Sequence, residues 1–204
     1  SITKTAQNIW VLGVTITGTA NGSETLTVVP AASTAIYDKA GNAASTSQSN
    51  NTASLTEKIL PTITNVTSTT SDGSYKQGET IAITVVFSEV VNVTGTPQLT
   101  LNNVSGGSNP VVNYSTGTGS NTLTFNYTVG SGETSNDLDY VATNSLGLNS
   151  GTIKDAALND ATLTLASPGA ANSLGANKAL IVDTSVPTIS SVSLNAANTE
   201  LTVT

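Results

Sequence analysis

Residues 122–129 read Thr-Leu-Thr-Phe-Asn-Tyr-Thr-Val, so polar and apolar side chains alternate without a break. Successive side chains of a β-strand point to opposite faces, and this alternation therefore predicts a strand with one buried face. Residues 81–87, Ile-Ala-Ile-Thr-Val-Val-Phe, are rich in β-branched residues and predict a second strand. Weaker patterns of the same kind predict strands at residues 10–17, 24–29, 62–69, 97–103, 110–115, 138–143, 161–165 and 178–183.

Turn-forming residues separate these predicted strands, as at Asp72-Gly73, Gly117-Thr118-Gly119 and Gly130-Ser131-Gly132. No segment shows the apolar stripe of an amphipathic helix. Many short strands separated by turns at this spacing predict an all-β fold, and more specifically an immunoglobulin-like β-sandwich.

Two short sequences occur twice. Residues 38–44, Asp-Lys-Ala-Gly-Asn-Ala-Ala, reappear in altered form at residues 155–161, Asp-Ala-Ala-Leu-Asn-Asp-Ala. The tripeptide Pro-Thr-Ile at residues 61–63 reappears at residues 187–189, which is 187 − 61 = 126 residues later. Sequence that recurs at such a distance is typical of tandem repeats. Leu158 takes the place of Gly41 in the second copy, so we expect the second turn to differ in shape.

The repeats predict one complete unit flanked by partial units. We expect residues 1–58 to be the C-terminal part of one unit, residues 59–184 a complete unit, and residues 185–204 the first strands of a third. The first and last residues indicate a piece of a longer polypeptide. Pro61 and Pro187 mark short linkers, because proline lacks an N–H group and does not continue a strand ladder. Neighbouring units are therefore expected to follow one another end to end.

The composition excludes several classes of function. Six lysines and thirteen acidic residues give a net charge of −7, which repels nucleic acid and anionic membrane surfaces. The chain has no histidine or cysteine, so it lacks the Ser-His-Asp and Cys-His nucleophilic sites and the usual ligands of zinc, iron and copper. No apolar run approaches the roughly 20 residues of a membrane span. We therefore expect a protein that is not an enzyme and does not insert into a membrane.

Several motifs resemble repeats of very long bacterial surface proteins. In the middle unit these are Gly-Glu-Thr-Ile at 78–81, Phe-Ser-Glu at 87–89, Thr-Gly-Thr-Pro at 94–97, Asp-Leu-Asp-Tyr at 137–140 and Gly-Thr-Ile-Lys-Asp at 151–155. The leading segment, with Val-Val-Pro at 28–30 and residues 37–42, resembles the closing half of bacterial Ig-like domains stacked in large secreted adhesins. This resemblance implies an extracellular or cell-surface stalk or spacer whose partners are neighbouring Ig-like units.

Carboxylate and amide side chains in the turns are candidate calcium ligands, because calcium takes roughly six to eight oxygen ligands in irregular geometry. In the adhesins that these units resemble, calcium at domain junctions stiffens the rod. We expect three clusters: Asp38 and Asn42 with Asp72 near Pro61; Asp155, Asn159 and Asp160 with Asp183; and Glu89 with Asp137 and Asp139.

Other interpretations of the same residues stay open. Asp and Asn in such turns also bond their own backbone without any metal. Asp137 and Asp139 are also consistent with a solvated strand edge, or, with Glu89, with an acid/base pair. A further alternative is an adhesive module that binds a glycan or a host protein through its loops. A last alternative is a head-to-tail filament, in which residues 187–204 complete residues 1–55 of another copy.

Overall fold

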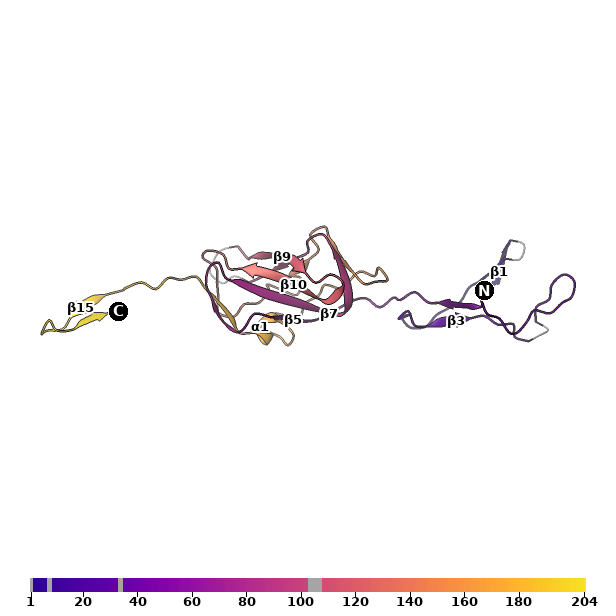
Figure 1. The fold of residues 1–204 in the computed structure, drawn as a ribbon, viewed down its shortest axis with the longest axis horizontal. Helices are drawn as coiled ribbons and strands as arrows, with labels where there is room; N and C mark the ends of the chain where they lie inside the picture. Colours follow the sequence, from indigo (N-terminus) through magenta and orange to yellow (C-terminus); the bar gives the residue numbers. More distant parts are fainter. Residues whose placement is uncertain (1, 7–8, 33–34, 103–107) are drawn as a thin grey trace. The chain divides into compact units, whose positions relative to one another are not determined.

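The structure is a computed structural model that describes residues 2–6, 9–32, 35–102 and 108–204. The chain divides into two compact units, Ser1–Leu60 and Pro61–Thr204. In the described residues both units consist almost entirely of β-strands and turns (Figure 1). The prediction of an all-β fold is confirmed.

In its described residues the first unit contains two antiparallel strand pairs. β1 (Ile2–Ala6) pairs with β2 (Ile9–Leu12), and β3 (Thr25–Thr27) pairs with β4 (Thr52–Ser54). The strand predicted at residues 10–17 stops at Leu12, directly before Gly13, and glycine weakens a strand. Large apolar side chains of this unit are between 46% and 56% exposed: Ile9, Val11, Leu12, Val14, Ile16, Val28, Val29, Ile36 and Tyr37.

The second unit is built around a seven-stranded antiparallel sheet. Its strand order is β12-β8-β9-β10-β7-β13, and β5 pairs with residues 83–87 of β7 on the edge opposite β10. These strands are β5 (Ile63–Ser68), β7 (Thr80–Thr94), β8 (Gln98–Thr100), β9 (Val111–Thr116), β10 (Ser120–Thr128), β12 (Leu146–Gly147) and β13 (Thr152–Lys154). The two strongest strand patterns of the sequence are thus β7 and β10, which pair with each other over most of the length of β10.

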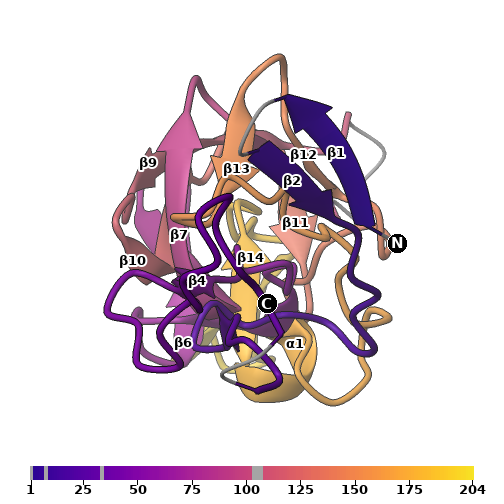
Figure 2. The same cartoon turned by 90° about the vertical axis from the view of Figure 1, so that its right-hand side faces the viewer.

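A smaller sheet lies beside the first. β14 (Leu180–Asp183) pairs antiparallel with β11 (Thr134–Ser135) and parallel with β6 (Gly73–Tyr75). A single helical turn, α1 (Leu174–Asn177), precedes β14, and its N-cap Ser173 accepts a hydrogen bond from the N–H of Ala176. Viewed from the end in Figure 2, β9 and β10 lie on one side of β14.

The buried core lies between these two sheets. From β7 and β10 it takes the apolar side chains at alternate positions, and from β14 it takes Leu180 and Val182. The alternate residues that face the core are Ile81, Ile83, Val85, Leu123, Phe125 and Tyr127, none of them more than 3% exposed. Burying one such side chain stabilises the fold by roughly 1.5 to 3 kcal/mol, so the alternation of residues 122–129 determines which face of β10 is inside.

Three predicted strands differ from the structure. In residues 138–143 only Tyr140 forms a bridge, with Leu101, and the N–H of Tyr140 donates to the carboxylate of the buried Asp139 instead of to a neighbouring strand. Residues 161–165 contribute a single parallel bridge, between Thr162 and Thr62. The strand expected at 178–183 begins only at Leu180, because α1 ends just before it. Residue 103 of the strand predicted at 97–103 lies outside the described residues.

The chain enters the second unit beside the middle of β7 and leaves it near the Thr80 end of β7, so entry and exit lie at opposite ends of the unit (Figure 1). At the beginning of the unit, Ile63 lies opposite Phe87. At the other end, Thr80 pairs with Thr128, and the following turn leads to Thr134, which pairs with Asp183. Seven residues of extended chain separate Thr80 from Phe87, which corresponds to about 23 Å.

A final hairpin follows the linker that contains Pro187. β15 (Val192–Leu194) pairs with β16 (Leu201–Val203), with Val192 opposite Val203 and Leu194 opposite Leu201. All six residues of these two strands are exposed.

Candidate functional site

Asp38 organises the first of the two repeated turns. Its Oδ1 accepts hydrogen bonds from the N–H groups of Ala40 at 2.9 Å and Asn42 at 2.8 Å, and its Oδ2 accepts one from the side-chain amide of Asn42 at 2.8 Å. The Asn42 side chain is the main reason why the pKa of Asp38 lies below its ordinary value. The N–H of Asp38 donates to the carbonyl of Asn42 at 3.0 Å and closes the turn.

Asp155 and Asn159 repeat this turn almost bond for bond. The N–H and side-chain amide of Asn159 donate to Asp155 Oδ1 and Oδ2 at 2.8 and 2.7 Å, and the N–H of Asp155 donates to the carbonyl of Asn159 at 3.1 Å. The flanking bonds match as well: Ala44 donates to Ile36 at 2.8 Å, and Ala161 donates to Ile153 at 2.9 Å. Every pair is 155 − 38 = 117 residues apart, so the repeat in the sequence is also a repeat of hydrogen-bonded structure.

The expectation that Leu158 changes the shape of the second turn is wrong. Gly41 has φ of 90° and Leu158 has φ of 69°, so both lie in the left-handed region. Leu158 accepts this conformation although it has a Cβ atom, because the four bonds between Asp155 and Asn159 and their neighbours fix the backbone.

We expect Leu158→Gly to stabilise the second unit by about 0.5 to 1 kcal/mol, because glycine adopts the left-handed region without steric cost. The Leu158 side chain is 74% exposed, so its removal loses little buried surface. Urea denaturation measures the change. Leu158→Ala is the control, since alanine keeps the Cβ atom; an equal gain from both substitutions would contradict the role of backbone strain.

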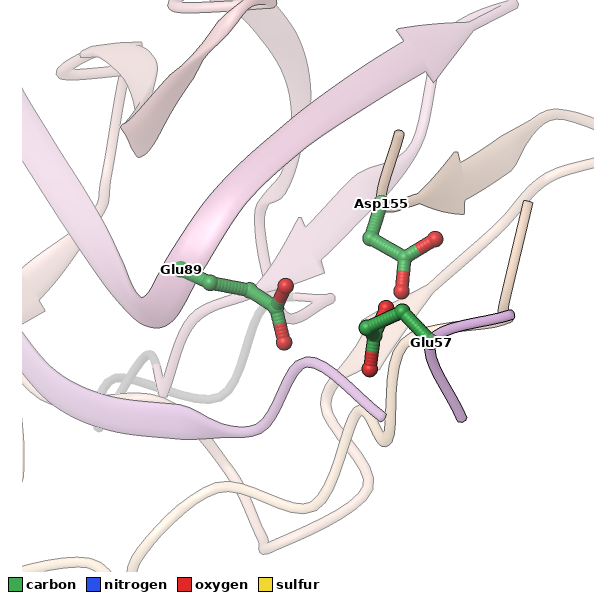
Figure 3. A group of neighbouring side chains, drawn as sticks. All are labelled: Glu57, Glu89 and Asp155. Atoms are coloured by element: carbon green, nitrogen blue, oxygen red, sulfur yellow. The ribbon is translucent and has the colours of Figure 1, made fainter. Parts of the chain in front are cut away.

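Glu89 and Asp155 bring two carboxylates together at the beginning of the second unit (Figure 3). An oxygen of the half-buried Glu89 lies within 4.8 Å of an oxygen of Asp155, which is 2% exposed. Like charges at this distance disfavour each other, and a cation between them removes the repulsion. Glu57, also drawn in Figure 3, belongs to the first unit, where its carboxylate accepts the N–H of Ile59, and it is not counted in this pair.

Asp160 and Asp183 do not join this pair. Asp160 forms an ion pair of 2.6 Å with Lys154. Asp183 lies at the opposite end of β7, where its Oδ1 accepts the N–H of Ser185 at 2.8 Å in an Asx turn. The cluster expected from Asp155, Asn159, Asp160 and Asp183 is therefore divided between the two ends of the unit, and the sequence offered no signal that Glu89 lies near Asp155.

Asp137 and Asp139 lie together beside α1. If Gly175 carried a Cβ atom, it would lie 3.0 Å from Asp139 Oδ2 and 3.3 Å from Asp137 Oδ2. Asp139 is 7% exposed, and its oxygens accept the N–H groups of Tyr140 and Gly169, both at 2.9 Å. A solvated strand edge is therefore wrong for Asp139, and Glu89, which was expected in this cluster, lies beside Asp155 instead.

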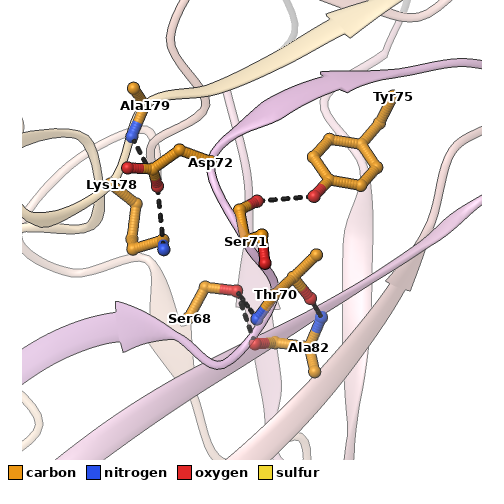
Figure 4. A network of polar contacts seen from close by, with 8 residues as sticks. All are labelled: Ser68, Thr70, Ser71, Asp72, Tyr75, Ala82, Lys178 and Ala179. Carbon is orange, nitrogen blue, oxygen red and sulfur yellow. Dashed lines mark hydrogen bonds and ion pairs between the residues drawn. The ribbon is translucent and has the colours of Figure 1, made fainter.

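Asp72 lies past the end of β5 that is far from Pro61, because β5 carries the chain away from the beginning of the unit. Its Oδ1 lies 2.8 Å from the Lys178 ammonium and accepts the N–H of Ala179 at 3.2 Å (Figure 4). Lys178 is the main reason why the pKa of Asp72 is lowered. Asp72 thus links the loop before β6 to the residues before β14, and it does not lie near Pro61 as expected.

The pKa shifts of Asp137 and Asp72 have opposite signs, so we expect these two residues to affect the stability of the second unit in opposite ways as pH changes. Partial burial, and then the charge of Asp139, raise the pKa of Asp137, so the folded state holds its proton more tightly than the unfolded state does. This tighter binding of the proton stabilises the folded state. The stabilisation is complete below pH 3.8, the ordinary pKa of an aspartate, and is lost as pH rises through the folded-state pKa of Asp137. We expect Asp137→Asn to raise the melting temperature at pH 7 and to have no such effect below pH 3.8.

Asp72→Asn serves as the control of opposite sign. The pKa of Asp72 is lowered on folding, so its ionised carboxylate stabilises the folded state. This stabilisation is present above pH 3.8 and is lost as pH falls through the folded-state pKa. We expect Asp72→Asn to lower the melting temperature at pH 7. Melting curves of both variants between pH 3 and pH 7 test this; a decrease in melting temperature for Asp137→Asn at pH 7 would contradict it.

Comparisons with known proteins give no relatives: no protein-family model, no curated protein and no solved structure matches the chain. Among the described residues there is no helix long and apolar enough to cross a membrane.

Proposed function

We propose that this chain is part of the stalk of a bacterial cell-surface or secreted adhesin-like protein, built from Ig-like β-sandwich units in series. The observation that carries the proposal is that the chain enters the second unit beside Phe87 and leaves it near Thr80, at opposite ends of the unit. Units with this connectivity join in a row without the chain turning back. The recurrence of the Asp38–Asn42 turn at Asp155–Asn159 supports a tandem array.

The pairing of β5 and β7 suits a unit that carries tension. A pull on Pro61 and Asp183 acts near Phe87 and near Thr80, so it is directed along the part of β7 that pairs with β5. The hydrogen bonds between β5 and β7 then bear the load together in shear. This is the property that a stalk requires, and it needs no catalytic residue, no nucleic acid and no membrane insertion.

Force spectroscopy on the full chain, pulled from its two ends, tests the proposal. We expect one dominant unfolding event that releases 183 − 61 + 1 = 123 residues, or about 40 nm of extended chain. We also expect the chain not to bind a glycan array or a panel of host proteins. Gradual extension without a force peak would contradict the stalk.

A groove in the second unit favours an adhesive module as the second candidate. The groove has a volume of about 550 Å³ and lies along β9 and β10, and Tyr114, Asn126, Tyr127 and Glu133 are among the residues that line it. Glu133 accepts the Tyr127 hydroxyl at 2.6 Å, so the polar groups of the wall are ordered. The volume lies in the range of small-ligand sites. Glycan binding that is lost in Asn126→Ala would favour this candidate over the stalk.

We also propose that calcium binds at the beginning of the second unit, between Glu89 and Asp155, and stiffens the junction there. The two carboxylates are hard oxygen ligands of the kind that calcium takes. An ion at this point neutralises the buried Asp155 beside Glu89. It also lies where the chain arrives from the preceding unit.

Thermal melts with calcium and with a chelator test this site. A ligand that binds only the folded state stabilises it by about 2.7 kcal/mol at a concentration 100 times its Kd. We expect calcium to raise the melting temperature of the second unit and Glu89→Gln to abolish the rise. Asp183→Asn, at the opposite end of β7, is the matched control and keeps it. Superimposable curves with calcium and with chelator would rule out the site and leave the turn as an Asx structure.

A further inference from the structure

β9 and β10 are paired over only part of their length. Thr124 pairs with Thr116. Phe125 pairs with Tyr114, and the pairing of the two strands ends there. Ser115 is an extra residue on β9 between these two pairs and forms a β-bulge. Because a bulge bends the strand that carries it, β9 and β10 separate beyond this point.

The groove along β9 and β10, with its volume of about 550 Å³, lies where the two strands separate. Residues 111–113 of β9 line one side of it, and residues 126–128 of β10 line the other. On their far sides these residues are paired, with β8 and with β7. On the sides that face each other they are not paired, within the part of the chain that the structure describes. The groove is therefore bounded by two open strand edges.

The main chain of Val111 and that of Thr128 point into this groove. The carbonyl of Pro110, just before Val111, accepts the N–H of Leu101 at 2.8 Å on the β8 side. The N–H of Val129, just after Thr128, donates at 2.9 Å to the residue before β7. Successive residues of a strand direct their N–H and C=O groups to opposite edges. Val111 and Thr128 thus direct theirs away from β8 and β7 and toward each other.

The groove carries one charged side chain. Glu133 lines it, and its Oε2 accepts the hydroxyl of Tyr127 and the N–H of Gly130, both at 2.6 Å. These two bonds hold the carboxylate in place. None of the described residues that line the groove is basic, so its charge is complementary to a cation.

We propose that the groove between β9 and β10 binds an extended peptide segment that carries a lysine or an arginine. The peptide forms main-chain hydrogen bonds with Val111 on one side and with Thr128 on the other, and so becomes a strand of the sheet. Since β9 and β10 are antiparallel, the peptide runs parallel to one of them and antiparallel to the other. Its cationic side chain pairs with the carboxylate of Glu133.

Two open strand edges are the reason why the ligand is a peptide and not a sugar. They present N–H and C=O groups at the repeat of a strand, and an extended main chain matches that repeat. The groove suits a single extended chain and not a folded domain, so the proposal agrees with a stalk that does not bind folded host proteins. It depends neither on the stalk function nor on calcium.

Fluorescence anisotropy with the full chain tests the proposal. The probe is a labelled peptide of about seven residues, in which threonine and valine alternate around a central lysine. We expect saturable binding. Replacing the lysine of the peptide by glutamate is expected to weaken binding at least about ten-fold, because two carboxylates would then face each other. A peptide with N-methylated alternate residues is expected not to bind, since it cannot donate main-chain hydrogen bonds.

Proline variants test the main-chain contacts. Val111→Pro and Thr128→Pro each remove an N–H that points into the groove and leave the bonds to β8 and β7 in place. We expect each to weaken binding at least about five-fold. Val111→Ala and Thr128→Ala are the matched controls and bind like the unmodified chain, because they keep the N–H. The melting temperature of the second unit shows which variants are folded.

Glu133→Gln keeps the test decisive if a proline variant does not fold. We expect this substitution to weaken binding of the lysine peptide at least about ten-fold and to leave binding of a peptide with glutamine in place of lysine unchanged. Hydrogen exchange of the unmodified chain gives a second measurement. The amides of Val111 and Thr128 are expected to exchange readily in the free chain and to be protected when the peptide is added.

Four results would overturn the proposal. The first is a lysine peptide that does not bind. The second is equal binding by the unmodified chain and by folded Val111→Pro and Thr128→Pro. The third is protection of both amides in the free chain, because the two edges would then already be paired. The fourth is a trisaccharide that displaces the peptide and no longer binds in Asn126→Ala, which would assign the groove to a glycan.

Discussion

Asp155→Ala is expected to lower the free energy of unfolding of the second unit by about 3 kcal/mol. The carboxylate accepts the N–H of Asn159 at 2.8 Å and its side-chain amide at 2.7 Å, in a position that is 2% exposed. Its removal leaves two donors without a charged acceptor in a partly buried position. Urea denaturation followed by tyrosine fluorescence measures the loss.

Asp38→Ala is the matched control, because Asp38 makes the same bonds to Asn42 in an exposed turn of the first unit. We expect it to change the unfolding of the second unit by less than about 0.5 kcal/mol. If the two substitutions had equal effects on the second unit, burial would not be the reason why Asp155 matters. A loss for Asp155→Ala that calcium increases further would connect the turn to the proposed ion site.

Gly117→Ala is expected to lower the stability of the second unit by about 3 kcal/mol, through steric overlap and backbone strain together. Gly117 lies in the turn between β9 and β10 with φ of 117°. A Cβ atom there would lie 2.2 Å from the carbonyl oxygen of Thr122 and 3.0 Å from the Cα atom of Leu123. Since both are backbone atoms of the central strand β10, relief requires that β10 moves.

Two other glycines, Gly119 and Gly147, separate the causes of this effect. Gly119 also has positive φ, at 78°, but a Cβ atom there would meet nothing within 4 Å, so we expect Gly119→Ala to cost only about 1 kcal/mol. Gly147 lies in β12 with open space around its Cα atom, and Gly147→Ala is expected to be neutral. If all three substitutions were equally destabilising, the contact with Thr122 would not be the cause. Thermal denaturation of the three variants ranks them.

The sequence alone was sufficient for the strands that face the core. The alternation of residues 122–129 and the β-branched run at 81–87 identified β10 and β7, because burial of one face of a strand imposes a period of two on its side chains. The repeated Asp-to-Asn turn was also visible, because its bonds join residues only four apart. Local geometry of this kind requires few partners elsewhere in the chain.

The arrangement of the acidic residues required the tertiary structure. Spacing along the chain grouped Asp155 with Asp183 and Glu89 with Asp137 and Asp139. The fold instead places Glu89 beside Asp155 and puts Asp183 at the far end of β7. Such distances depend on strand order and register, which are set by burial of the whole core and not by neighbouring residues.

The same division applies to the segment that begins at Pro187. The spacing of Pro61 and Pro187 by itself determined that residues 187–204 resemble the start of a unit. Only the tertiary structure showed that Val192, Leu201 and Val203 are exposed where Val66, Ile83 and Val85 are buried. A pattern of apolar residues indicates which face of a strand can be buried, whereas burial itself depends on strands that lie far away in the sequence and are brought there only by the packed fold.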